Sequence, residues 1–259
     1  MERPGLFDYP SFFLDLIQFP ASALLPDWLS IALWALGVSS LSMYMYGRLS
    51  QQDVLAELGP SRDDARQRLA AYDGPFAGLP PLIRENLSLS RQHLWLTFVP
   101  ALLSGLPVIV VLVWMSNAFG AFSPAAATPV SVVVKSYTPY ELHWRPAAAA
   151  RRISATHWVL LWPEDGEKLT LLSGSGDQLL QLPTPRPTVI LHPRLWWNDL
   201  IANPGGYLEP GNNLIEVRLG VPERQIVPIG PSWMRGWFPY FLALLVAFSL
   251  MFKRIWRLH

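Results

Sequence analysis

The residues with the clearest capacity for chemistry are hydroxyl groups inside apolar segments. Ser39 and Ser42 lie in one uncharged run, and Thr97 and Ser104 lie in another. Hydroxyls at such positions can hydrate a polar group that passes through lipid, which lowers the cost of its transfer. Met43 adds an adaptable apolar side chain beside them. The five residues predict a small substrate groove; the alternative is that they only pack helices together.

Other chemical signals are weak. Five histidines are scattered without metal-ligand spacing, namely His93, His143, His157, His192 and His259. The chain has no cysteine, which excludes disulfides and thiolate metal sites. The net charge of +1 gives no argument for a nucleic-acid partner. We therefore expect no enzyme, no metal, no cofactor and no bound nucleic acid.

Long uncharged runs must position the hydroxyls, and the chain has three such runs, two of which carry them. A helix needs about 20 apolar residues to cross a bilayer, and tryptophans and tyrosines flank these runs, as expected at a membrane interface. A helix buried in a soluble core is the alternative, but such helices rarely lack charge for so long. The sequence predicts transmembrane helices at residues 28–47, 92–117 and 236–253.

Small residues recur along the predicted spans and predict close contacts between helices. They are Ala35 in the first, Ala101 and Gly105 in the second, and Ala243 and Ala247 in the third.

Two prolines interrupt the second span, Pro100 and Pro107. Proline leaves a carbonyl of the preceding turn without a backbone donor. We expect a kinked helix whose freed carbonyls are met by neighbouring groups, with Thr97 and Ser104 as candidates.

The charges outside the spans predict an orientation. Residues 48–91 carry six arginines, and the third span ends at Lys253, followed by Arg254 and Arg257 in the tail 254–259. The segment 1–27, in contrast, has one arginine against four acidic residues. Positive residues near spans stay cytoplasmic. The amphipathic segment 1–27 is therefore expected outside, on the membrane surface or as a plain loop, with the C-terminus inside.

The segment 48–91 is expected to form a cytoplasmic helical hairpin. Gly59-Pro60 should stop its first helix, and Ser61, with Asp64 three residues on, should cap a second. Pro80-Pro81 should open a helix that runs into the second span. The hairpin is either a solvated connector or a docking surface.

This organisation resembles the YidC/Oxa insertase superfamily, and most closely its small members related to the catalytic subunit of the endoplasmic-reticulum membrane protein complex. The resemblance is carried by "LSQQDVLAELGPSRDDARQRL" after the first span, and by "RQHLWLTFVPALLSGLPVIVVLVW" in the second. It covers roughly residues 28–116 and 236–257 and implies insertion of membrane proteins. Two departures are notable: no Arg or Lys lies mid-membrane, and a long connection separates the last two spans.

That connection, residues 118–235, reads as an all-β, sandwich-like domain. Turn signals such as Pro-Glu-Asp-Gly at 163–166 separate short apolar or β-branched runs that predict strands. The runs are "TPVSVVVKSY", "THWVLLW", "EKLTLL", "QLLQLP", "PTVILHP", "NLIEVRLGV" and "RQIVPI". The stretch "RLWWNDLIANPGGYL" interrupts them and predicts a short helix plus a loop. Its aromatic residues Trp196, Trp197 and Tyr207 are candidates for partner binding, although they can equally pack on the domain or rest on the membrane.

Together these features predict an α-helical membrane protein with three spans, a cytoplasmic helical hairpin and an extracytoplasmic β domain. The expected function is membrane-protein insertion or assembly; the alternative is a non-catalytic subunit of a larger membrane complex. The expected partners are membrane lipids and integral membrane proteins or nascent chains. Only three of the 20 basic residues are lysines, which favours a GC-rich bacterial genome and hence a bacterial inner membrane.

Overall fold

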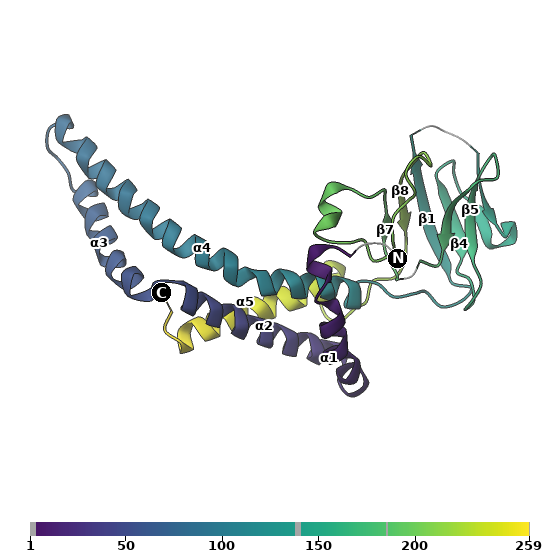
Figure 1. Ribbon diagram of the computed structural model, residues 1–259, viewed down its shortest axis with the longest axis horizontal. Coiled ribbons are helices and arrows are strands. Elements are labelled where there is room, and N and C mark those ends of the chain that lie inside the picture. Colours follow the sequence, from purple (N-terminus) through teal and green to yellow (C-terminus); the bar gives the residue numbers. More distant parts are fainter. Residues whose placement is uncertain (1–3, 138–140, 185, 259) are drawn as a thin grey trace. The chain divides into compact units, whose positions relative to one another are not determined.

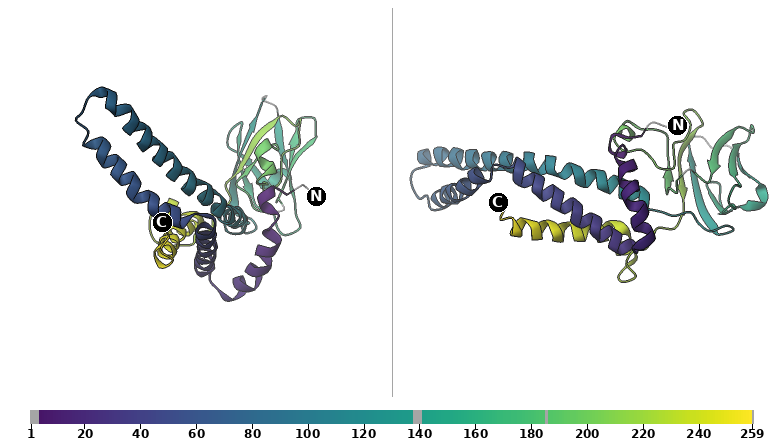
Figure 2. Two further views of the ribbon diagram at one scale, coloured as in Figure 1. Left: turned by 60° about the vertical axis from the view of Figure 1, so that its left-hand side comes forward. Right: turned by 60° about the horizontal axis from the view of Figure 1, so that its bottom comes forward.

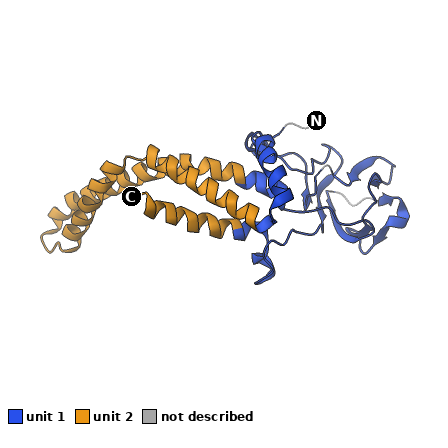
Figure 3. Ribbon diagram, turned by 90° about the horizontal axis from the view of Figure 1, so that it is seen from below, with its two compact units in different colours: residues 1–28, 112–240 blue, residues 29–111, 241–259 orange. Residues whose placement is uncertain are grey.

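The computed structural model describes residues 4–137, 141–184 and 186–258, so that His259 and the first three residues of segment 1–27 lie outside the described residues. The chain divides into two compact units (Figure 3). One contains residues 1–28 and 112–240, and the other contains residues 29–111 and 241–259.

Three helices are long and apolar enough to cross a membrane (Figure 1). They are α2 (Asp27–Leu49), the later part of α4 (Leu79–Phe119) and α5 (Trp237–Ile255). Their positions agree with the three predicted spans. The chain is therefore a membrane protein with a helical part and a separate β region.

The segment between α2 and α4 forms a helical hairpin, as expected, but its first arm is one helix (Figure 2). Helix α3 (Gln52–Ala70) runs through Pro60 and lies beside the start of α4. The predicted stop at Gly59-Pro60 and the predicted cap at Ser61 are wrong. Ser61 instead donates its hydroxyl to the carbonyl of Glu57 within the helix.

Burial explains why α3 continues. Leu55 and Leu58 before the proline, and Ala65 after it, are all buried. An interior proline costs about 3 kcal/mol, and apolar burial on both sides of it offsets that cost. Arg68 joins the arms through Glu85, 2.7 Å away. The hydrogen bond with Glu85, followed by the charges of Glu85 and Asp64, raises the pKa of Arg68 above its ordinary value.

We expect Gly59→Ala to stabilise the hairpin. A Cβ at Gly59 would meet nothing within 4 Å, and alanine in a helix interior is favoured over glycine by about 1 kcal/mol. The gain should appear as slower amide exchange across α3. Unchanged or faster exchange would show that the helix does not continue through this position.

Helix α4 likewise continues through Pro100 and Pro107. The predicted role of the nearby hydroxyls, to meet the carbonyls that the prolines leave free, is wrong. Thr97 donates to the carbonyl of His93 at 2.8 Å, and Ser104 donates to that of Ala101 at 3.1 Å. These carbonyls lie one turn before the hydroxyls and are not the ones that the two prolines leave free.

The β region is a two-sheet sandwich in which all pairs of described strands are antiparallel. The larger sheet has the order β3-β4-β1-β8-β7, and the smaller has the order β2-β5-β6. The strands are β1 (Pro129–Ser136), β2 (Leu142–Arg145), β3 (Ala150–Arg152), β4 (His157–Leu161), β5 (Leu169–Ser173), β6 (Gln178–Leu182), β7 (Ile190–Leu191) and β8 (Leu214–Leu219).

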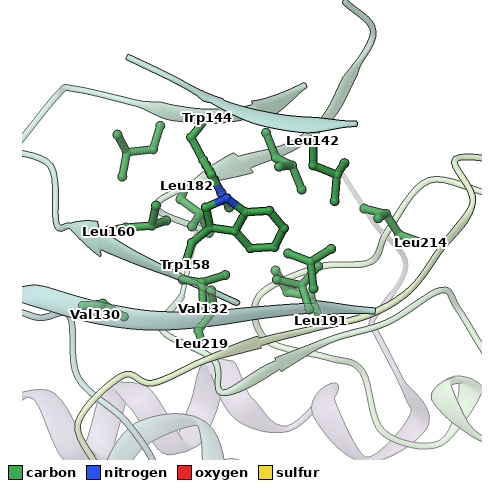
Figure 4. Packing of buried hydrophobic residues seen from close by; sticks show 14 of the residues in the cluster. Val130, Val132, Leu142, Trp144, Trp158, Leu160, Leu182, Leu191, Leu214 and Leu219 are labelled. Atoms are coloured by element: carbon green, nitrogen blue, oxygen red, sulfur yellow. The ribbon is translucent and has the colours of Figure 1, made fainter. Parts of the chain in front are cut away.

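The core lies between the two sheets (Figure 4). Alternate residues point inward, so that Val130, Val132 and Val134 of β1 are buried while their neighbours are less so. Trp144 and Trp158 come from opposite sheets and meet in this core. The sandwich is therefore held by apolar packing of the kind that the strand pattern predicts.

The strand prediction has three errors. The run "RQIVPI" forms no strand, since Pro228 interrupts it and the amides of Ile226 and Val227 bond to the carbonyl of Arg235. Strands β2 and β3 were not predicted, because each spans at most four residues beside Pro146 or polar turns. The predicted short helix exists as η4 (Trp196–Asp199).

Candidate functional site

The hydroxyls of the predicted groove bond to backbone carbonyls, two of them between helices. Ser39 is fully buried and donates to the carbonyl of Leu245, 3.2 Å away, which links α2 to α5. Ser42 donates to the carbonyl of Ser104 at 2.7 Å, which links α2 to α4. Met43 is half-buried. The arrangement favours helix packing, and the groove stays a prediction.

The five predicted packing residues divide into two groups. Ala35 is fully buried. Ala101, Ala243 and Ala247 are exposed, and a Cβ placed on Gly105 would meet nothing within 4 Å. Only Ala35 therefore packs within the described chain. The residues of each remaining pair are four apart, Ala101 and Gly105 on α4 and Ala243 and Ala247 on α5. Both pairs remain open to another helix or to lipid.

The apolar sides of α4 and α5 are largely uncovered. Phe241 is the single buried residue of α5, a helix of 19 residues. One side of α4 exposes a row of large apolar residues, namely Leu94, Trp95, Phe98, Leu102, Leu106 and Ile109. Spans that bury so little against each other present most of their surface to the surroundings.

The aromatic loop, which we define as residues 186–209, is held by its own side chains. The ring of His192 lies 5.3 Å from that of Trp197 and 6.1 Å from that of Tyr207. Tyr207 accepts a hydrogen bond from the amide of Asn203 at 2.9 Å. Trp196 is 82% exposed. Of the three predicted partner-binding residues, Trp196 is the most exposed, Trp197 is 38% exposed and Tyr207 is half-buried.

Three aspartates of the N-terminal segment bind other parts of the same unit. Asp8 accepts from the amide of Ala202 at 2.7 Å. Asp15 accepts from the indole N–H of buried Trp114 at 2.7 Å. Asp27 pairs with Arg224 at 3.1 Å. In the sequence these aspartates are recognisable only as charge, because nothing local to them indicates a partner.

Helix α1 (Ser11–Leu24) is amphipathic, as expected, but its polar side is the one that contacts protein. Asp15 lies on that side, together with Ser11, Gln18 and Ser22 at helical spacing. No residue of α1 is buried. Most large apolar residues of the helix are exposed, namely Phe12, Phe13, Leu16, Ile17, Phe19 and Leu24, whereas Leu14 is half-buried. Such a helix suits an apolar environment on its outer side.

A cavity of about 890 Å³, which we call the span-end cavity, lies in the same unit. Its walls come from the last turns of α4, from the aromatic loop and from the first turn of α5. Most of the lining is apolar and includes Trp197, Trp233 and Trp237. Its charged lining residues are the neighbours Glu223 and Arg224. Because no local motif marks it, sequence reasoning missed this site apart from Trp197.

The described residues contain little that resembles a catalytic site. Ser131 and His157 share a hydrogen bond of 2.8 Å across β1 and β4. Within residues 4–137, 141–184 and 186–258, no carboxylate bonds to His157, and no group of three or more His, Asp or Glu side chains could hold a metal ion.

Comparison with known proteins gives no match, either to a family model or to a curated protein or solved structure.

Proposed function

We propose that the protein is a membrane-protein insertion or assembly factor of the YidC/Oxa type, with an added outer β domain. The observation that carries the proposal is the uncovered apolar surface of α4 and α5, where α5 buries only Phe241. A client helix entering the bilayer could rest against these faces before it reaches its final partners. The charged hairpin of α3 and α4 would receive the client on the cytoplasmic side.

The hydroxyls of the predicted groove are already hydrogen-bonded, which limits the kind of client segment that the protein can handle. Ser39, Ser42 and Ser104 already donate to carbonyls, and Ser39 and Ser104 are also buried, so they have little capacity to hydrate a passing charge. A charge at mid-bilayer costs about 2.5–3.5 kcal/mol on the insertion scale. We therefore assign the protein to holding and assembling apolar helices rather than to moving charged segments.

A second candidate is a non-catalytic subunit of a larger membrane complex. The observation that favours it is the exposure of Ala101 on α4, beside Gly105, and of Ala243 and Ala247 on α5. Small residues four apart allow the backbones of two helices to approach closely. A permanent partner helix would cover these positions.

Photocrosslinking separates the two candidates. A photoreactive residue is placed at exposed Ala101 or Ala247, with buried Ala35 as the matched control. An assembly factor should crosslink to several newly made membrane proteins, and these products should disappear when synthesis stops. A subunit should crosslink to one partner at all times, which would overturn the first proposal. Crosslinks to lipid alone would overturn both.

A further inference from the structure

We propose that the span-end cavity binds one phospholipid whose headgroup carries both a phosphate and an ammonium group. This inference does not rest on the proposed function. The cavity's volume of about 890 Å³ lies within the roughly 300–1,000 Å³ that is typical of sites for small ligands. Such sites are mostly apolar with a few placed polar groups, which also describes this one.

Chain connectivity places the cavity beside lipid. Ser116 and Asn117 in its wall belong to the last turn of α4, and Trp237 and Phe238 belong to the first turn of α5. These are the ends of two predicted spans. Phospholipids present their headgroups and upper acyl chains at that level, where tryptophans are enriched. A lipid is thus the apolar ligand with the most direct access to this cavity.

The two charged residues of the lining, Glu223 and Arg224, specify the headgroup. Arg224 uses one guanidinium nitrogen for Asp27, and its remaining N–H groups can donate to a phosphate. The neighbouring carboxylate of Glu223 is exposed and complements an ammonium group. The carboxylate of Glu223 would repel a purely anionic headgroup. Glu223 and Arg224 together therefore fit a zwitterionic headgroup better than an anionic one.

The site can be tested by native mass spectrometry of the full chain purified in mild detergent. We expect one retained phospholipid per chain. Titration of delipidated protein with phosphatidylethanolamine and with phosphatidylglycerol should show about tenfold tighter binding of the former, and Glu223→Gln should remove that preference. Equal binding of the two lipids by the wild type would overturn the headgroup assignment.

Two filling variants test the cavity itself. Ile201→Trp and Val189→Trp place an indole in the cavity from its wall, whereas Ile229→Trp, at a residue that is 78% exposed and outside the lining, is the matched control. Both filling variants should lose the retained phospholipid and the control should keep it. Near-ultraviolet circular dichroism identifies a variant that fails to fold. Retention by a folded filling variant, or a bound peptide in place of lipid, would overturn the proposal.

Discussion

Replacing Leu160 with alanine is expected to destabilise the β sandwich by about 2–5 kcal/mol, the usual range for a leucine removed from a packed core. Leu160 is fully buried between the sheets and lies opposite Val130 in the β1–β4 ladder. The substitution removes apolar contacts and leaves a cavity that the rigid sheets cannot fill. The melting temperature of the domain should fall by on the order of 10 °C.

The adjacent residue supplies the control. Leu161 belongs to the same strand but points to the opposite face, where it is 46% exposed. Leu161→Ala makes the same chemical change and should cost less than about 1 kcal/mol. Both losses of stability can be measured by unfolding the full chain in detergent while the circular dichroism of its tryptophans is monitored. Equal losses for the two variants would show that the two faces of β4 are assigned wrongly.

The second large effect is expected at Gly5. A Cβ there would lie 2.7 Å from both the carbonyl carbon and oxygen of Leu200 and 2.8 Å from the amide nitrogen of Ala202. All three atoms belong to the backbone, so no side chain can move aside. Gly5→Ala should separate the N-terminal segment from the aromatic loop.

Separation would break two hydrogen bonds, from the amide of Phe7 to Leu200 and from the amide of Ala202 to Asp8. Each is worth about 0.5–3 kcal/mol, with the higher values for the charged acceptor. Hydrogen exchange at Phe7 and Ala202 should accelerate about tenfold or more. Gly37→Ala, where a Cβ meets nothing within 4 Å, should leave both amides unchanged. Unaltered exchange in Gly5→Ala would contradict this contact.

The sequence predicts the spans well because their signal is local. Long uncharged runs with aromatic flanks can be recognised without knowledge of any contact, and α2, the later part of α4 and α5 follow them. The error at Pro60 has the opposite cause. Local propensity favours a break there, but burial of Leu55, Leu58 and Ala65 along one helix outweighs it.

The contacts of the N-terminal segment could not be predicted in this way. Asp15 and Trp114 are separated by 99 residues, Asp8 and Ala202 by 194, and Asp27 and Arg224 by 197. Each aspartate looks like ordinary surface charge until the fold brings its partner close. The span-end cavity is hidden for the same reason, because its walls come from segments that are distant in the sequence.

We propose that three helices cross a membrane, with the β domain outside and the hairpin inside. Because the chain contains no cysteine, single cysteines can be introduced at two exposed positions, Asp165 in the β domain and Asp63 in the hairpin. A membrane-impermeant maleimide applied to intact cells should label Asp165→Cys, and it should label Asp63→Cys only after the membrane is opened. Labelling of both positions from the same side would contradict the claim.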